Sequence, residues 1–391
     1  MTSTNTELLI IGAGPFGLAL SAQAQHDHIE HLIVGKPMEF WRSNMPKGMF
    51  LRSACDWHLD PQNVHTIEAY LQSRGQTPKD VEPLSLDFYL TYIDWFQKQK
   101  NIQPLQSYIQ RLDRLPNHDF VATTIDGNVI NAKNVVLAPG FSNFAHVPED
   151  LKAKLPAGSY QHTVEYVDFS DAANKRYLII GGRQSAFEWA ALLLEAGAAA
   201  VHLSHRHASP AFAVADWSWV KPLVDNMVEN PSWFRRLSQK EKDDISFRMW
   251  SEGRLKIEPW LESRLRNERV NVWPQTEVRS CNVNGSNELE VKLTNGESIK
   301  VDKLVLATGY KVDIARVPVL ANGNLLEQIK TRNGFPVLDD HFETSVLGLF
   351  ITSMPAMQDF GPFFGFTNSV RTSARLITAR LCSESARRRF S

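Results

Sequence analysis

Three glycines near the start of the chain have the spacing of a phosphate-binding turn. Gly12, Gly14 and Gly17 follow a short apolar run and precede an alanine-rich segment. In such a unit the first glycine permits a tight turn, the second lets a pyrophosphate approach the backbone, and the third allows the helix to pack on the strand. Free N–H groups at the helix start face the phosphates, and Pro15 there loses no useful donor. We therefore expect these glycines, Pro15 and Phe16 to bind a dinucleotide.

A second turn of this kind lies about half the chain later. Gly181, Gln184 and Ser185 again stand between an apolar run and an alanine-rich segment. Arg183 takes the place of the middle glycine, so a side chain stands where bare backbone would approach a phosphate. Its guanidinium either pairs with the pyrophosphate or blocks the site, and we expect pairing. Two such turns suggest that one protein holds two dinucleotides and transfers electrons between them.

The elements around each turn repeat in the same order. Hairpins around Asp126-Gly127 and Asn295-Gly296 each lead into an apolar strand that ends in Ala-x-Gly, at Gly140 and Gly309. The expected elements in the first half are strands over 7–11, 31–34, 121–125, 128–132 and 135–137, with helices over 15–25 and 86–99. This internal repeat predicts an α/β fold with two Rossmann-like dinucleotide-binding domains.

A tryptophan-rich segment between about residues 210 and 262 interrupts the second domain. It holds Trp217, Trp219, Trp233, Trp250 and Trp260, half of the ten tryptophans, among helical charge patterns. We expect a helical insertion whose rings either pack a small core of their own or form a lid or substrate wall. The expected domains are 1–160 (first domain, first part), 161–308 (second domain with the insertion) and 309–391 (first domain, second part).

Composition excludes several classes of function. The formal net charge is −1, which favours neither nucleic acid nor an anionic membrane. The three cysteines are far apart in sequence, so there is no metal-binding or CxxC redox spacing. No run approaches ~18 apolar residues, and the short polar start leaves no room for a secretory signal. We expect a cytoplasmic protein without a metal, and its oligomeric state stays open.

Two further segments carry candidate binding residues. Around Trp41, Met49 and Arg52 the chain mixes aromatic, sulfur-containing and basic side chains without periodicity, which suits either a loop against a flat ring system or an ordinary packed loop. At the end of the strand over 31–34, an acid that would bind a ribose is missing and Lys36 follows instead.

These motifs together resemble the two-dinucleotide flavoprotein monooxygenases, which include flavin-containing monooxygenases, Baeyer–Villiger monooxygenases and lysine/ornithine N-hydroxylases. The first glycine turn matches the FAD fingerprint of that group. The stretch 306–310, with Thr308 and Gly309, is similar to its strand crossing back to the FAD domain. The stretch 348–366, with Gly365, is similar to its closing FAD segment. The resemblance implies FAD on the first domain and NADPH on the second.

A second family signature precedes the second turn. Gly158, His162 and Tyr166 match its spacing, and Pro156 replaces its phenylalanine. The resemblance implies that His162 acts at the domain junction. After the next strand of the second domain no acid occurs, and Arg206 could bind a 2′-phosphate, which favours NADPH over NADH.

The function implied by the resemblance is that of an FAD-dependent, NADPH-using monooxygenase. Reduced flavin would activate O2, and one oxygen atom would pass to a small-molecule substrate, possibly in N-hydroxylation of an amine. Arg52, His162 and Asp359 are the candidates for residues near the reaction centre. The alternative is an FAD-dependent oxidase or dehydrogenase with a degenerate nicotinamide site, which Arg183 would explain. A flavin disulfide reductase would need a cysteine pair, and a flavin-binding protein without enzymatic activity is a third class.

Overall fold

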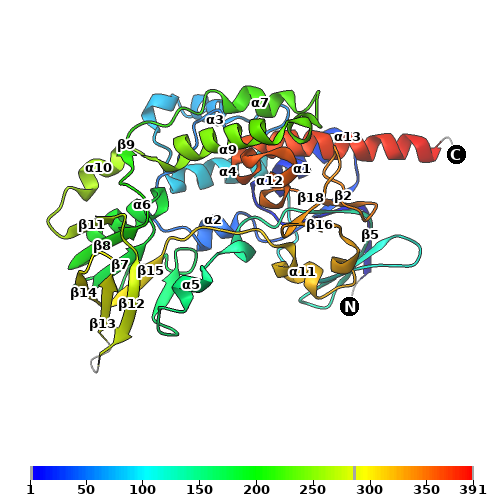
Figure 1. The fold of residues 1–391 in the computed structure, drawn as a ribbon. Coiled ribbons are helices and arrows are strands. Elements are labelled where there is room, and N and C mark those ends of the chain that lie inside the picture. Colours follow the sequence, from blue (N-terminus) through cyan, green and yellow to red (C-terminus); the bar gives the residue numbers. More distant parts are fainter. Residues whose placement is uncertain (1–2, 285–287, 390–391) are drawn as a thin grey trace.

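Two sheets form the framework of the computed structural model, which describes residues 3–284 and 288–389 (Figure 1). In this part of the chain the first sheet has six strands in the order β2-β1-β5-β4-β3, with β18 also beside β5. Their bounds are β1 (Ser3–Ile11), β2 (His31–Val34), β3 (Ile109–Arg114), β4 (Phe120–Thr124), β5 (Val129–Leu137) and β18 (Leu349–Ile351). Because β18 pairs in parallel with β5, both ends of the chain build the first domain.

The second sheet consists of five parallel strands in the order β11-β8-β7-β15-β6. Their bounds are β6 (Tyr160–His162), β7 (Arg176–Ile180), β8 (Ala200–His205), β11 (Val270–Pro274) and β15 (Lys303–Leu306). An antiparallel three-stranded sheet of β12 (Val278–Val283), β13 (Leu289–Leu293) and β14 (Ser298–Val301) precedes β15. The predicted α/β fold with two Rossmann-like domains is therefore confirmed.

Local sequence accounts for the main helices. Helix α1 (Pro15–His26) begins with a proline at its first position, and α6 (Gln184–Glu195) begins at the second glycine turn. Helix α4 (Leu86–Gln99) has the predicted bounds because the Ser85 hydroxyl accepts a hydrogen bond from the N–H of Phe88 and caps its first turn. The shorter helices are α2 (Glu39–Ser43), α3 (Ile67–Gln72), α5 (Glu149–Lys152), α11 (Pro318–Ala321) and α12 (Met357–Phe360).

One strand prediction is wrong. The two strands expected over 128–132 and 135–137 are the single strand β5. Its first half pairs with β4 and its second half with β18, while β1 pairs along its other edge. The distant partner β18 therefore continues the sheet where the hairpin with β4 ends, so the strand runs on without a break.

The insertion packs on the first domain through residues 217–249 and on the second domain through residues 257–265, rather than around a core of its own. It contains β9 (Ala211–Phe212), α7 (Val220–Asn226), α8 (Trp233–Arg236), α9 (Gln239–Arg254), β10 (Lys256–Ile257) and α10 (Trp260–Leu265). Val220, Val224 and Phe234 belong to the hydrophobic cluster of the first domain, and Trp217 and Trp219 pack against it. Figure 1 shows α7 and α9 running along the same side of the molecule as α13 (Val370–Arg389). The expectation of a separate small core is therefore corrected.

Helix α13 closes the first domain. It packs along α1, and the Oγ1 hydroxyl of Thr372 at its start donates to the carbonyl of Val224 in the insertion, 3.1 Å away. Buried Arg371 lies beside buried His58, with 2.6 Å between Nη1 and Nε2. The described helices include none long and apolar enough to cross a bilayer.

The buried pair of His58 and Arg371 predicts a loss of stability in acid. Burial, followed by the positive charge of Arg371, lowers the pKa of His58 to about 3, so the folded state holds a neutral ring that can accept from the guanidinium. Below pH ~6.5 this histidine takes up a proton in the unfolded chain but not in the folded chain. The free energy of unfolding therefore decreases as the pH is lowered, by about 2 kcal/mol between pH 7 and pH 5. Thermal melts of His58→Gln should show a smaller drop over this interval.

A matched control for this prediction is His26→Gln, which replaces an exposed histidine of α1. It should keep the full drop between pH 7 and pH 5. If His58→Gln keeps that drop as well, another group titrates and the assignment to His58 is wrong.

Candidate functional site

Both glycine turns open onto one cavity of about 1340 Å³. This volume exceeds the ~300–1,000 Å³ of a usual small-molecule site and has room for more than one ligand. The candidate residues that border it are Gly12, Gly14, Pro15, Phe16, Lys36, Trp41, Met49, Arg52, Gly140, Gly181, Arg183, Gln184, Ser185, Arg206, Thr308, Gly309 and Gly365. Gly17, His162 and Asp359 are not part of its lining by the described residues.

The three glycines of the first turn differ in what surrounds them. A Cβ on Gly12, whose φ is +113°, would lie 2.4 Å from the carbonyl oxygen of Ala138. A Cβ on Gly17 would lie 1.8 Å from the carbonyl oxygen of Gly12. Gly14, the residue that precedes α1, would meet nothing within 4 Å because it faces the cavity. Two glycines therefore make the turn compact, and the third leaves open space at the N-terminus of a helix, which is suited to an anion.

The second turn repeats this construction with one exception. A Cβ on Gly181, whose φ is +143°, would lie 2.5 Å from the carbonyl oxygen of Ala307, the alanine of the second Ala-x-Gly. Arg183 precedes α6 with φ −119° and ψ −178°, close to the −82° and −170° of Gly14. The backbone is thus the same, and only the side chain differs. No other described side chain forms a hydrogen bond or ion pair with the Arg183 guanidinium, which borders the cavity.

Basic residues continue this surface at the end of β8. Arg206 is exposed and His205 is buried, and both border the cavity. Burial lowers the pKa of His205, and its Nδ1 lies 2.9 Å from the carbonyl oxygen of His207. The His205 ring also explains why residue 182 is a glycine, because a Cβ on Gly182 would lie 2.3 Å from the ring.

Beyond the end of β2, an acidic side chain reaches the cavity although the strand itself ends without one. Glu39 borders the cavity beside Lys36, with 3.6 Å between Nζ and Oε1. The hydroxyl of Tyr108 donates to the same carboxylate, and Lys36 Nζ lies 5.0 Å from the centre of the Tyr108 ring. Met38, whose φ is +54°, turns the chain just before α2, so Glu39 at the start of this helix lies beside Lys36, which spacing alone did not indicate.

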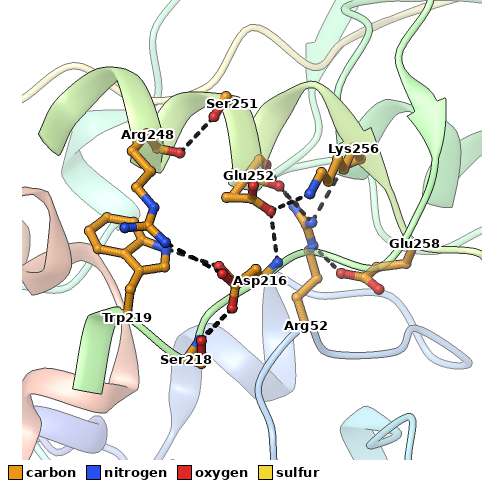
Figure 2. A network of polar contacts seen from close by, with 10 residues as sticks. Arg52, Asp216, Ser218, Trp219, Arg248, Ser251, Glu252, Lys256 and Glu258 are labelled. Atoms are coloured by element: carbon orange, nitrogen blue, oxygen red, sulfur yellow. Dashed lines mark hydrogen bonds and ion pairs between the residues drawn. The ribbon is translucent and has the colours of Figure 1, made fainter. Parts of the chain in front are cut away.

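Arg52 fastens the end of α9 to the first domain. Its Nε donates to Glu258 Oε1 at 2.7 Å, and its Nη1 donates to the carbonyl of Gly253 at 2.6 Å. Its Nη2 donates to the carbonyl of Glu252 at 3.3 Å. Figure 2 shows the guanidinium at the carbonyl end of α9, where cations stabilise a helix. Arg52 borders the cavity, but its donors are used by the insertion, so the structure gives it a positioning role.

Loss of Arg52 should detach the insertion. Arg52→Met leaves Glu258, whose side chain is 8% exposed, as an unpaired buried charge. We expect a destabilisation of about 3 kcal/mol and faster proteolysis within residues 213–260. The control is Arg248→Met, which removes an exposed guanidinium over Trp219, one turn before Glu252 in α9, and should cost less than about 1 kcal/mol. Equal melting temperatures for the two variants would contradict this role of Arg52.

His162 and Asp359 are held away from the cavity lining. Nε2 of buried His162 donates to the carbonyl of Gly309 at 3.1 Å, and its Nδ1 accepts from the N–H of Val164 at 3.2 Å. Burial lowers the His162 pKa, which agrees with a neutral ring. Asp359 accepts from Arg332 at 3.0 Å and from the N–H of Leu338 at 2.9 Å. His162 therefore ties β6 to the crossing segment, and Asp359 ties α12 to the segment that holds Arg332 and Leu338.

Several cavity residues were missed by sequence reasoning. Trp57, Trp217, Arg254 and Phe366 border the cavity and come from three distant parts of the chain. The only available signal was the tryptophan-rich composition of the insertion, which allowed the alternative that its rings form a substrate wall. It did not indicate which tryptophan would do so.

Two curated relatives match parts of the chain. "Ferredoxin--NADP reductase 2" of Shouchella clausii is 35% identical over 202 residues, which is 47% of this chain and 56% of that protein. "FAD-dependent urate hydroxylase" of Xanthomonas campestris pv. campestris is 35% identical over 219 residues, which is 52% of this chain and 46% of that protein. The match thus spans about half the length of each relative.

Solved structures match over nearly the whole chain. The ornithine N-hydroxylase of Kutzneria sp. 744 has a TM-score of 0.78 at 16% identity and covers 99% of this chain and 100% of its own. The ornithine hydroxylase of Pseudomonas aeruginosa has a TM-score of 0.76 at 17% identity, with 97% and 99% covered. At this identity the similarity establishes the fold.

Family models extend this assignment to the sequence. A model described as pyridine nucleotide-disulphide oxidoreductase matches residues 9–247, and a second model of that description matches residues 248–352. The first match alone contains both glycine turns. The chain therefore belongs to the pyridine nucleotide-disulphide oxidoreductase family.

Proposed function

We propose that this protein is an FAD-dependent monooxygenase that uses NADPH and inserts one oxygen atom of O2 into a small-molecule substrate. The observation that carries the proposal is the one cavity onto which both glycine turns open. Two dinucleotides must share a site if electrons are to pass from one to the other. The same fold in two ornithine hydroxylases supports oxygen transfer to an amine nitrogen as one form of this reaction.

The first domain provides a suitable cradle for FAD. Open space at Gly14 adjoins the free N–H groups of α1, so a pyrophosphate can approach there without a steric clash. We assign its phosphates to Gly12, Gly14, Pro15 and Phe16, its ribose end to Lys36, and its ring system to Trp41, Met49, Gly140, Thr308, Gly309 and Gly365. When bound, FAD supplies the hydride acceptor and the reactivity toward O2, and the protein supplies binding, orientation and shielding from water.

NADPH is assigned to the second turn. Arg183, Gln184 and Ser185 stand at the N-terminus of α6, and the guanidinium of Arg183, with which no other described side chain pairs, can replace the backbone contact of a glycine with a charge-assisted one. Arg206 follows β8 as a cation suited to a 2′-phosphate. We accordingly assign residues 1–160 and 309–391 to the FAD-binding domain and 161–308 to the NADPH-binding domain. With only three cysteines in 391 residues, we propose that the protein acts in the cytoplasm.

Disulfide reduction is not proposed, although the family description includes it. Cys55 and Cys281 are buried in different hydrophobic clusters, and Cys382 is exposed on α13. Burial raises the pKa of the Cys55 thiol to about 12, so the nucleophilic thiolate is disfavoured. A redox pair needs two adjacent sulfur atoms, and these positions do not provide them.

Anaerobic mixing of the FAD-loaded protein with NADPH tests the proposal. Rapid bleaching of the flavin absorbance, followed by transfer of one isotopically labelled oxygen atom from O2 to a product, is the expected result. A flavin that is not reduced by NADPH would favour the alternative, an FAD-dependent oxidase or dehydrogenase in which Arg183 blocks the nicotinamide site. A protein that takes up no FAD would overturn both.

A further inference from the structure

Three aromatic rings from distant parts of the chain meet at the cavity wall. Trp57, Trp217 and Phe366 all border the cavity, and their ring centres lie 6.2–6.3 Å apart in all three pairings. Trp57 is 5% exposed, whereas Phe366 retains 38% exposure. We name Trp57, Trp217 and Phe366 the aromatic triad. It joins the first domain, the insertion and the closing segment, and it offers an apolar aromatic surface to a ligand.

The charges near the aromatic triad disfavour a cationic ligand. The guanidinium of Arg52 lies 5.5 Å from the centre of the Trp217 ring, so a cation already occupies the neighbourhood of this ring. Residue 253 packs on the same ring, since a Cβ on Gly253 would lie 3.0 Å from Trp217. Arg254, the next residue, borders the cavity, and no other described side chain pairs with its guanidinium. Because Glu258 neutralises Arg52 at 2.7 Å, Arg254 is the cation here that no other described side chain neutralises, and it suits a neutral or anionic ligand.

The acidic residues of the cavity lie on other elements. Within the described part of the lining they are Glu39, Asp150 and Glu277, which lie on α2, on α5 and just before β12. Asp216 is next to Trp217 in sequence, but its carboxylate accepts from Ser218 and Arg248, away from the lining. An aliphatic diamine or a basic amino acid needs a carboxylate near each ammonium group that it buries. The segments that carry the aromatic triad place none on the cavity wall.

We propose that the aromatic triad is the substrate subsite and that it selects a neutral or anionic molecule with an aromatic ring. The ring packs on the cavity side of Trp57, Trp217 and Phe366, and Arg254 pairs with an anionic group where the substrate has one. The inference rests on the proposed function, because it names the substrate class of that same cavity. It also distinguishes this chain from the ornithine hydroxylases that share its fold.

Calorimetric titration of the FAD-loaded protein with four matched probes tests the inference. The probes are phenylacetate (anionic), phenylacetamide (neutral), phenethylamine (cationic) and cadaverine (an aliphatic diamine). Phenylacetate and phenylacetamide should bind, and phenethylamine and cadaverine should bind at least about tenfold more weakly because the site is positive and lacks a carboxylate.

Variants locate the binding site of phenylacetate and phenylacetamide. Trp217→Leu and Phe366→Leu should weaken phenylacetamide binding about tenfold or more. Trp250→Leu, which removes a tryptophan of the same insertion that pairs with Phe247 and does not border the cavity, should leave it unchanged. Arg254→Gln should weaken phenylacetate about tenfold and phenylacetamide less than twofold.

Three results would overturn the inference. The first is cadaverine or phenethylamine binding as tightly as phenylacetate. The second is failure of both phenylacetate and phenylacetamide to bind. The third is unchanged binding of phenylacetamide in the Trp217 and Phe366 variants. Flavin content and anaerobic reduction by NADPH are measured on the same preparations. If the flavin is bound and reduced while the probes give one of these results, the subsite is wrong and the proposed function stands. If no flavin is bound, the proposed function fails first.

Discussion

Replacement of Gly17 by alanine is expected to destabilise the protein by about 3 kcal/mol or more and to yield material without bound flavin. The added Cβ would lie 1.8 Å from the carbonyl oxygen of Gly12 and 3.0 Å from its carbonyl carbon. Both are backbone atoms of the tight turn, so no side chain can rotate to relieve the overlap. Helix α1 must move away from β1, and the phosphate cradle opens with it. Thermal melting and flavin content of the purified protein measure the two effects.

Gly14→Ala is the matched control because its Cβ has open space around it and its φ of −82° suits any residue. Without FAD, the free energy of unfolding of this variant should lie within about 0.5 kcal/mol of that of the parent. The new methyl group occupies the space proposed for the pyrophosphate and should weaken FAD binding. The two variants thus separate a packing glycine from a ligand-facing glycine. Full flavin occupancy in Gly14→Ala would contradict the assignment of this turn to FAD, and a normally stable Gly17→Ala would contradict the packing argument.

Charge reversal at Arg183 is expected to raise the concentration of NADPH needed for half-maximal flavin reduction about 100-fold. A charge-assisted pair with a phosphate contributes roughly 1.5–3 kcal/mol, and Arg183→Glu replaces that attraction with repulsion. The guanidinium forms no hydrogen bond with other described side chains, so the fold should be unaffected. Anaerobic stopped-flow reduction over a range of NADPH concentrations measures the change, with flavin content as the check on integrity.

Two further substitutions at this position decide between pairing and blocking. Arg183→Lys keeps the charge but loses the planar fork, so its effect should be smaller than that of Arg183→Glu. Arg183→Gly restores the glycine of the usual turn. If Arg183→Gly is reduced by NADPH faster than the parent, the guanidinium obstructs the site. The alternative of a degenerate nicotinamide site would then be correct.

Most of the fold could be predicted because its signals are local. The glycine turns, the bounds of α4, the hairpin of β13 and β14, and the repeat that ends at Gly140 and Gly309 all depend on residues a few positions apart. The repeat also has a structural counterpart, since Gly12 contacts Ala138 as Gly181 contacts Ala307. Steric limits on the backbone and the period of apolar residues specify such features without knowledge of distant contacts.

The candidate site was only partly predictable. Gly12 and Gly181 were found because their positive φ favours glycine, and both border the cavity. Arg52 was expected to lie near a flat ring system, but its partners Gly253 and Glu258 lie about 200 residues away. No pattern in the sequence connects these positions, because the contact depends on how the insertion lies on the first domain.

The sequence by itself determined two βαβ units with glycine turns and their order, because sterics and hydrophobic periodicity act between near neighbours. The tertiary structure decided that the insertion packs on the first domain and that Trp57, Trp217 and Phe366 meet at one wall. Burial of apolar surface drives that packing, and it is non-directional, so it gives no spacing rule in the chain. Which side chains face a ligand therefore emerges only when all three segments are assembled.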